Sequence, residues 1–308
     1  MASARASRLY RLALALAGAG LFAVVAGLVT AAGTASLGVP SFAALAAACK
    51  AVVPDDVEPM VLPAAVVGAL GVAVLLRGGF SAWRRLRDDR RSRAAFEGPE
   101  VRLAGETLTL IADHAPRAFC AGWLRPRIYV SAGTVERLNA SELEAVVAHE
   151  QHHRRRRDPV RILLLDVLAD ALFFLPALGV AACRYRALAE VAADEAAVRR
   201  SGRERLASAL LSFNDAQAPD GAVVGVAPER VDHLLGEPTR WALPMLALLA
   251  SSLAVTGLLA VAAVLLLAAD SPVGSSILVA QSCMAILCPP LAVAGMLVIG
   301  ASRLRSRF

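Results

Sequence analysis

Four long apolar runs divide the 308-residue chain. The runs cover residues 12–37, 60–76, 241–268 and 276–299. Each is close to the length of a membrane-spanning helix, which needs about 20 mostly apolar residues. The first run is too long for the core of a secretory signal, and no clear cleavage site follows it. The pattern predicts a two-helix transmembrane hairpin over residues 1–76, a second one over 241–308, and a separate region at 77–240.

A fifth apolar run, at 160–183, is long enough to cross, but one crossing would place residues 184–240 on the other side and reverse the last two spans. It carries Asp166 and Asp170, four apart on one helical face, with Pro176 beyond them. Charges in lipid are costly unless they face protein or water. We therefore expect a helical hairpin or re-entrant pair broken near Pro176 and packed on the membrane side of the central region. A single crossing is the competing interpretation.

The polar central region has its own pattern of elements. Residues 128–130 are β-prone, whereas residues 141–153 and 184–195 have the composition of helices. Ser141 is the expected N-cap of the first of these helices, with Glu144 as its capping-box partner. The pattern predicts two helices in this region; the small β-sheet is implied only by the family resemblance given below.

Composition agrees with a membrane protein. Hydrophobic residues make up 57% of the chain, and the mean hydropathy is +0.58. A soluble domain of this size has too little polar surface to cover so many apolar side chains. The five cysteines form no Cys-x-x-Cys pair, which argues against a zinc-thiolate site or a disulfide framework. The chain is thus expected to be a mainly α, multipass membrane protein.

The charged residues orient the spans. Arginines flank the apolar runs at Arg5, Arg8 and Arg11, at seven positions from Arg77 to Arg93, and at Arg303, Arg305 and Arg307, whereas the two links between paired spans carry Asp55, Asp56, Glu58 and Asp270. By the positive-inside rule, both termini and the region 77–240 face the cytoplasm. Because the arginines lie beside apolar runs, where they meet anionic lipid, the formal net charge of +6 does not indicate nucleic-acid binding.

A His-Glu-x-x-His pentapeptide lies on the predicted helix 141–153. His149 and His153 are four apart, so both imidazoles share one face, where their nitrogens can reach a metal at about 2.0–2.1 Å. Glu150 can act as a general base toward the water that attacks a peptide carbonyl. Three of the five histidines fall within these five residues, which argues against a chance match. His152 is treated as a neighbour, because pairing it with His149 would deprive Glu150 of this role.

A catalytic zinc site needs a third protein ligand and one open position. The predicted helix 184–195 carries Glu190 and Asp194 four apart on one face. One carboxylate can bind the metal while the other accepts a hydrogen bond from a metal-bound histidine. We favour Glu190 as the ligand and Asp194 as the supporting residue. Glu195 is the nearest competitor but is rotated off that face, and a solvated helix with paired charges is the alternative.

Several motifs, in order along residues 80–240, resemble the BlaR/MecR-type membrane metallopeptidases, which are related to HtpX-like and CAAX prenyl protease gluzincins. The stretch from His149 to Asp158 is similar to that family's HExxHxxRRD motif, and Glu190 to Asp194 is similar to its ExxxD helix. The segment from Arg117 to Val130 resembles a strand segment with phenylalanine, glycine, proline and isoleucine, and residues 230–235 resemble a short arginine-leucine motif.

The resemblance implies a gluzincin-like zincin domain in which His149, His153 and Glu190 bind zinc and Glu150 is the catalytic base. It also implies that Phe119, Cys120 and Ala121 lie on a strand whose edge can bind the substrate backbone. A purely structural role for that strand is the alternative. Asp158 either holds an arginine or orients the ligand helix.

We therefore expect a membrane-embedded zinc endopeptidase that cuts a protein, such as a transcriptional repressor in antirepressor relatives or a misfolded membrane protein in HtpX-like ones. The chain contains no Ser-x-x-Lys motif, so direct sensing of β-lactams is not expected. Three residues are candidates for stabilising the oxyanion: Tyr185, Arg186 and His233. A non-enzymatic receptor with a peptidase-like fold is the main alternative, but it would be expected to have lost the base or a ligand, and all four residues are present.

Overall fold

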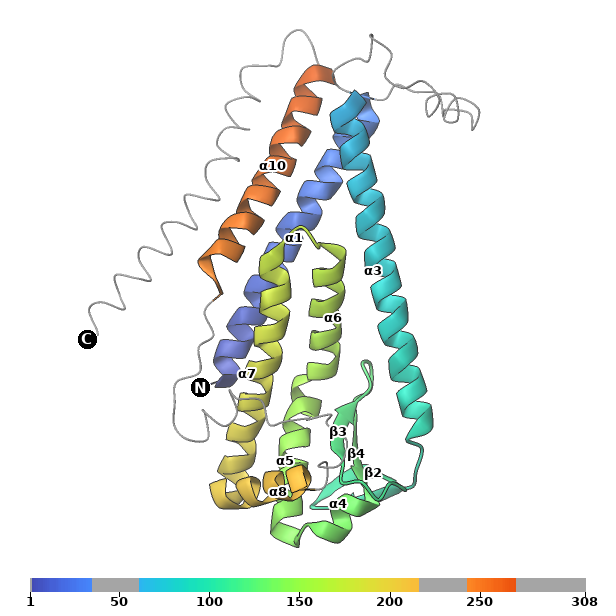
Figure 1. Ribbon diagram of the computed structural model, residues 1–308, viewed down its shortest axis with the longest axis vertical. Coiled ribbons are helices and arrows are strands. Elements are labelled where there is room, and N and C mark those ends of the chain that lie inside the picture. Colours follow the sequence, from blue (N-terminus) through green and yellow to red (C-terminus); the bar gives the residue numbers. More distant parts are fainter. Residues whose placement is uncertain (1, 35–60, 216–242, 270–308) are drawn as a thin grey trace, which may run out of the picture. The chain divides into compact units, whose positions relative to one another are not determined.

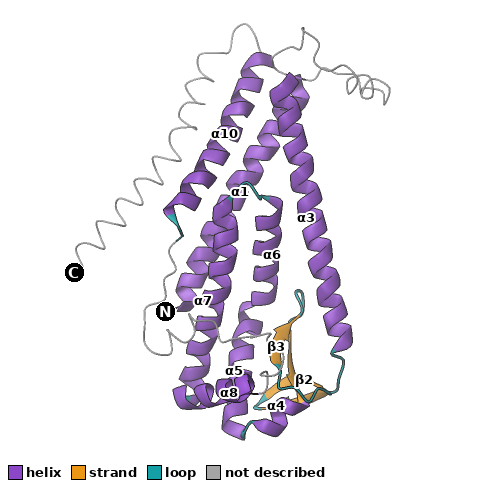
Figure 2. Ribbon diagram, in the orientation of Figure 1, coloured by secondary structure: helices purple, strands orange, loops and turns teal. Residues whose placement is uncertain are grey.

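The structure is a computed structural model that describes residues 2–34, 61–215 and 243–269 (Figure 1). It is mostly helical, with one small sheet (Figure 2). The helices are α1 (Ala2–Thr34), α3 (Val61–Ala95), α4 (Ala132–Arg137), α5 (Ala140–Arg156), α6 (Asp158–Ala171), α7 (Pro176–Ser201), α8 (Arg203–Asp215) and α10 (Met245–Ala269). The strands are β1 (Glu100–Leu103), β2 (Glu106–Ile111), β3 (Ala118–Ala121) and β4 (Arg127–Ser131). The predicted mainly α membrane fold with a small sheet is confirmed.

Three of the described helices are long and apolar enough to cross a membrane. The candidate spans are Ala2–Ala31 in α1, Ala65–Ala95 in α3 and Met245–Leu267 in α10. They correspond to the first three predicted spans, while the predicted fourth span at 276–299 lies outside the described residues.

The first two spans differ from the prediction at their arginine-rich ends. Helix α1 begins ten residues before the apolar run, and α3 continues past Arg77 to Ala95. Arginine is a good helix former, and its long stem lets the guanidinium reach water while the backbone stays helical. The arginines therefore lie on the helices and not in flanking loops.

The chain forms two compact units. One contains Met1–Leu14, Gly78–Asp170 and Leu178–Leu243, and the other contains Ala15–Arg77, Ala171–Ala177 and Pro244–Phe308. The first three turns of α1 thus belong to the same unit as the sheet and the predicted metal ligands.

In the second unit, small residues let helices approach closely. A Cβ atom placed on Gly27 of α1 would lie 2.7 Å from Val67 of α3, and one on Gly71 of α3 would lie 2.8 Å from Leu28 of α1. This is the small-residue packing typical of membrane helices. At the start of α7, the backbone N–H of Ala177 donates to the hydroxyl of Ser251 on α10 at 3.1 Å, which satisfies one of the free N–H groups of that helix end.

The sheet has the strand order β1-β2-β4-β3. Strands β1 and β2 form an antiparallel hairpin whose turn residues Ala104 and Gly105 both have positive φ, the backbone of a tight hairpin turn. Strand β2 runs parallel to β4, and β3 pairs antiparallel with β4 alone. Strand β3 is therefore an edge strand of the sheet.

One face of the sheet packs on α5. Leu108, Ile128 and Val130 of the strands form a buried cluster with Leu143, Val146 and Val147 of the helix. These apolar residues fix α5 beneath the sheet and hold its histidine-bearing end at a defined place.

The start of α5 corrects the sequence-based expectation. The N-cap is Asn139, whose side-chain oxygen accepts from the backbone N–H groups of Ser141 and Glu142, while Glu142 accepts from the N–H of Asn139. The predicted box of Ser141 and Glu144 does not form. Both pairs fit the three-residue spacing, and the helix begins at the earlier one; Glu144 instead pairs with Arg200 at 3.2 Å.

The apolar run at 160–183 is shared between two helices. Helix α6 ends at Ala171, and α7 begins at Pro176 and returns beside α6 (Figure 1). Proline suits the first turn of a helix because the N–H that it lacks would have no partner there. The chain therefore changes direction just before Pro176.

The two aspartates of this run have polar partners within the protein. Arg85 of α3 lies 2.9 Å from a carboxylate oxygen of both Asp166 and Asp170. Asp166 also pairs with Arg186, and Asp170 accepts a hydrogen bond from Ser81 at 2.6 Å. Paired in this way, the carboxylates avoid the cost that unpaired charges have in an apolar segment.

Candidate metal centre

The two predicted histidine ligands point their Nε2 atoms at a common place. His149 and His153 are one turn apart on α5, and their Nε2 atoms lie 3.2 Å from each other. Each residue is only 8% exposed. Two imidazole nitrogens this close and directed to one point are the arrangement expected of metal ligands.

Helix α7 brings Glu190 to the same place. Its Oε2 lies 3.5 Å from Nε2 of His149, and its Oε1 lies 3.5 Å from Nε2 of His153. The three donor atoms lie within 4.8 Å of one another, and no other group of this kind is found in residues 2–34, 61–215 and 243–269. The donor set of two imidazoles and a carboxylate fits a divalent metal ion.

The second nitrogen of each imidazole faces a buried carboxylate. His149 Nδ1 lies 2.9 Å from Oδ1 of Asp194, and His153 Nδ1 lies 2.9 Å from Oδ2 of Asp158. Both aspartates are 1% exposed. A proton held on each Nδ1 leaves the Nε2 lone pairs free for a metal, which is the usual role of such partners.

The backbone between α5 and α6 directs Asp158 to His153. Arg157, the C-cap of α5, has left-handed backbone angles of φ 54° and ψ 41°, and its N–H donates to the carbonyls of Arg154 and His153. This single left-handed residue ends one helix and lets the next begin at Asp158. The carboxylate of Asp158 then lies against the ring of the last ligand on α5.

Nearby carboxylates make the centre favourable for a cation. Burial by itself would lower the pKa of His149, but Asp194, Glu190 and Glu150 raise it to about 10. Burial would raise the pKa of Asp158, but hydrogen bonds from His153 and Tyr185 hold it below its ordinary value. The metal-free centre therefore retains a proton on His149, which a metal ion would displace.

Glu150 is buried on α5, the helix that packs against strand β3. It is 8% exposed. Burial raises the pKa of the Cys120 thiol on β3 to about 12, and the negative charge of Glu150 is the next cause. The predicted base thus lies near enough to the edge strand for its charge to act on Cys120, on the same helix as the two histidines.

The predicted substrate segment lies on β3, and its side chains alternate between the two faces of the sheet. Phe119 stacks on Tyr129 of β4 with ring centroids 5.2 Å apart, and it meets Phe96 edge-on at the same distance. Cys120 is on the opposite face, the face of α5, as is Ala118, which packs on the sheet–α5 core. Of Phe119, Cys120 and Ala121, Cys120 is therefore the residue directed toward the ligand helix.

Two of the three oxyanion candidates are engaged elsewhere. Tyr185 is fully buried, and its O–H donates to Asp158 at 2.7 Å. Arg186 pairs with Asp166. The third candidate, His233, lies outside the described residues, as does the arginine-leucine motif at 230–235.

His152 does not join the cluster of donor atoms. Burial and the positive charges around it lower its pKa to about 4, so the imidazole is neutral. Its ring centroid lies 6.4 Å from that of His153. This agrees with its treatment as a neighbour of the site.

An arginine partner of Asp158 is one of the two roles expected from the sequence, whereas its contact with Tyr185 has no signal there. The Arg156 Nε atom lies 3.8 Å from Oδ1 of Asp158. The only sequence signal for Arg156 was its position within the HExxHxxRRD motif, which does not say which arginine pairs with Asp158.

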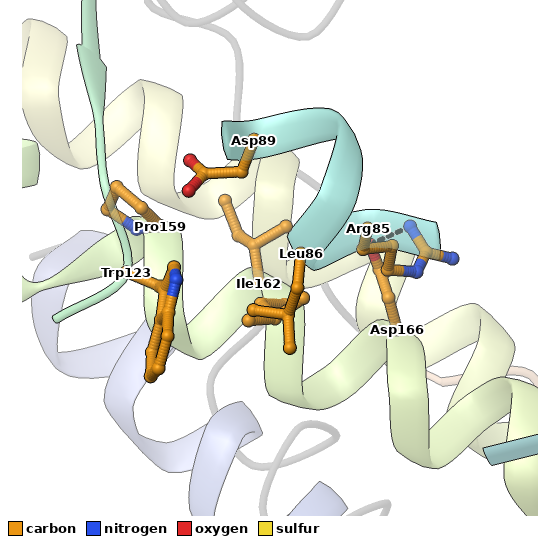
Figure 3. A pocket seen from close by; sticks show the side chains of 8 residues that line it. Arg85, Leu86, Asp89, Trp123, Pro159, Ile162 and Asp166 are labelled. Atoms are coloured by element: carbon orange, nitrogen blue, oxygen red, sulfur yellow. Dashed lines mark hydrogen bonds and ion pairs between the residues drawn. The ribbon is translucent and has the colours of Figure 1, made fainter. Parts of the chain in front are cut away.

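A cavity of about 180 Å³ lies between α3, α6 and the β3–β4 loop (Figure 3). Its lining residues are Arg85, Leu86, Asp89, Trp123, Pro159, Ile162, Leu163 and Asp166. Because these include no predicted ligand and not Glu150, the cavity does not mark the metal centre. Among the lining residues, Pro159 is the closest in sequence to a residue of that centre, because it follows Asp158 directly.

The sequence is similar to known peptidases. The profile of the family described as BlaR1 peptidase M56 matches residues 25–235, more than two thirds of the chain. The chain is 37% identical to Protease HtpX of Nitrosococcus oceani over 71 residues, which is 21% of this chain and 24% of that protein. It is 27% identical over 139 residues to the Protease HtpX homolog of Leuconostoc mesenteroides, which is 41% of this chain and 46% of that protein.

Protease HtpX of Acinetobacter baylyi is 33% identical over 91 residues, 28% of each chain. The chain thus spans less than half the length of each of these curated relatives. No solved structure matches it.

Proposed function

Because the chain belongs to the BlaR1 peptidase M56 family, we propose that it is a membrane-embedded zinc endopeptidase with its centre at His149, His153 and Glu190. The observation that carries the proposal is the convergence of these three donor atoms beside the buried carboxylate of Glu150. Hydrolysis of a peptide at a metal ion needs protein ligands for the ion and a general base close to it.

The distances favour zinc. Donors at about 2.0–2.1 Å from a tetrahedral zinc ion lie about 3.3–3.4 Å from one another. The Nε2 atoms of His149 and His153 are 3.2 Å apart, and each lies 3.5 Å from a different carboxylate oxygen of Glu190. Three protein ligands leave one position open, as in catalytic zinc sites. When bound, zinc supplies Lewis-acid chemistry: it polarises a carbonyl and makes water acidic near neutral pH.

The residues around the metal site have separate roles in the proposed reaction. Glu150 accepts a proton from the attacking water and returns it to the leaving amine, as a general base and then a general acid. Asp194 and Asp158 hold the two imidazoles in the orientation that directs Nε2 to the metal.

Strand β3 is proposed to bind the substrate backbone. It is an edge strand with one hydrogen-bonding side unpaired within the described sheet, and it lies next to the helix that carries Glu150. An extended peptide added beside Phe119, Cys120 and Ala121 would pass in front of the base. Binding along the backbone suits cleavage within a protein chain. Both a transcriptional repressor and a misfolded membrane protein meet this description.

We place the catalytic region on the cytoplasmic side of the membrane, between an N-terminal hairpin at 1–76 and a C-terminal hairpin at 241–308. The arginine clusters support this orientation by the positive-inside rule. The start of α1 belongs to the same compact unit as the metal centre, which supports placing the N-terminus on the same side.

Removal of the metal tests the proposed activity. Casein hydrolysis by the detergent-purified protein is expected to fall to background after treatment with a strong zinc chelator and to return on addition of about one zinc ion per chain. Addition of magnesium is the control, because this hard cation prefers oxygen ligands and octahedral geometry. Proteolysis that persists in the metal-free protein would contradict the proposal.

Cysteine labelling tests the orientation. In a cysteine-free background, Arg137→Cys and Arg203→Cys are expected to react with a membrane-impermeant maleimide only after the cells are permeabilised. Asp56→Cys, in the acidic link, is expected to react in intact cells. Labelling of positions 137 and 203 from opposite sides would contradict both the orientation and the assignment of Glu190 as a ligand.

A further inference from the structure

The start of the first membrane helix is packed in the unit that holds the metal centre. Ala2, Ala6 and Leu9 of α1 are 3%, 0% and 1% exposed. Ala2 packs with Val191 and Ala192 of α7, on the turn between Glu190 and Asp194. These first turns of α1 are therefore part of the environment of the metal centre.

Two serines of α1 hold the guanidinium of Arg156. Ser3 and Ser7 are one turn apart; the Nη1 of Arg156 donates to Ser3 Oγ at 2.5 Å, and its Nη2 donates to Ser7 Oγ at 3.0 Å. The remaining nitrogen, Nε, is buried without a hydrogen bond and lies at ion-pair distance, 3.8 Å, from Oδ1 of Asp158. The side chain of Arg156 is only 16% exposed, so the two hydroxyls determine the direction in which this charge points.

Tyr10, at the next position of the same helical face, contacts the second partner of Asp158. Its ring centroid lies 5.5 Å from that of Tyr185, whose O–H donates to Asp158 Oδ1 at 2.7 Å. The guanidinium of Arg161 lies over the Tyr10 ring, 5.4 Å from its centroid. Residues 3, 7 and 10 form a single helical stripe, because side chains three and four apart lie on one face.

The branch through Arg156 and the branch through Tyr185 both end at Oδ1 of Asp158. The other oxygen of Asp158, Oδ2, lies 2.9 Å from Nδ1 of His153. The carboxylate is 1% exposed, so neighbouring side chains and not water determine its orientation. Two routes therefore connect α1 with Asp158 and His153: hydrogen bonds and an ion pair through Arg156, and a ring contact and a hydrogen bond through Tyr185.

We infer that Ser3, Ser7 and Tyr10 of α1 are positioning residues for the metal ligand His153, acting through Arg156 and Tyr185 on Asp158. The inference rests on the proposed zinc peptidase function. According to this inference, the position of the first membrane span affects the active site. A rotation or shift of α1 would move the partners of Asp158 and weaken the contact of Asp158 with His153.

Paired substitutions at the two serines test this inference. Ser3→Ala/Ser7→Ala is expected to weaken zinc affinity, measured by chelator competition, roughly tenfold, the lower end of the effect of removing a residue that supports a metal ligand. The kcat for casein is expected to fall by a similar factor, with KM within a factor of two. Ser3→Thr/Ser7→Thr keeps the hydroxyls and should restore both values. Ser3→Val/Ser7→Val has the shape of the threonine pair without the hydroxyls and should not restore them.

Arg155→Ala is the control, because Arg155 is exposed on the same turn of α5. Equal zinc affinity and kcat in wild type and the alanine pair, or identical behaviour of the threonine and valine pairs, would overturn the inference. If the serine variants fail to fold, Tyr10→Leu against Tyr10→Phe gives the same comparison at the other branch, and only the leucine variant should weaken zinc binding. A wild-type protein without zinc-dependent proteolysis would instead refute the proposed function.

Discussion

Proteolysis by the Glu150→Gln variant is expected to fall by about two to four orders of magnitude, which is what a general base contributes. The metal content should stay at about one zinc ion per chain, because Glu150 is not among the three donors that converge on the site. Glutamine has the shape of glutamate but cannot accept the proton of the attacking water. The measurement compares casein hydrolysis and bound metal in wild type and variant, both purified in detergent.

Glu144→Gln is the matched control for this substitution. Glu144 lies on the same helix, but its carboxylate pairs with Arg200 at 3.2 Å, away from the donor cluster. Its variant should keep most of the wild-type activity. Equal proteolysis by wild type and Glu150→Gln would rule out the proposed mechanism, and loss of zinc from Glu150→Gln would make this residue a ligand instead of a base.

Substitution of Glu190 is expected to have the largest effect on metal binding. Its two carboxylate oxygens lie 3.5 Å from the Nε2 atoms of His149 and His153, and α5 and α7 share no other such cluster among their described residues. Glu190→Ala leaves two imidazoles, which are too few for a stable catalytic zinc site. Zinc affinity should fall by more than the roughly 10- to 100-fold that loss of a supporting residue costs.

Glu195→Gln separates this assignment from its nearest competitor. The carboxylate of Glu195 accepts hydrogen bonds from the backbone N–H of Ala2 at 3.2 and 3.3 Å, so it faces the start of α1. Its glutamine variant is expected to bind zinc with an affinity close to that of wild type. Both variants are measured by titration with a competing chelator. If Glu195→Gln lost zinc and Glu190→Ala kept it, the third ligand would have been assigned wrongly.

Local spacing was sufficient for the parts of the site that lie on one helix. His149, Glu150 and His153 occupy α5 in the relation that the pentapeptide predicts, because the helical repeat fixes which side chains share a face. The same reasoning placed Glu190 and Asp194 on one face of α7. The distance between α5 and α7 cannot be read from the local sequence, because it depends on how the turn at residues 172–175 returns the chain.

Local rules failed where two patterns competed. Asn139 with Glu142 and Ser141 with Glu144 both have the spacing of a capping box, so the spacing does not say which forms; in the structure Asn139 is the N-cap, and Glu144 pairs with Arg200 of α7. Tyr185, on the same predicted helix as Glu190, is one of the three candidates for stabilising the oxyanion. The fold turns it instead toward Asp158.

The sequence by itself determined the membrane character, the elements of the peptidase region and the identity of the ligand and base candidates. Apolar run length and the 3.6-residue helical period are local properties, and both can be read without knowing what each element contacts. The tertiary structure decided which carboxylate supports which histidine, and that Ser3, Ser7 and Tyr10 at the start of α1 lie against the partners of Asp158. The contacts of α1 join residues more than 140 positions apart, and only the packing of α1, α5 and α7 in one unit brings them together.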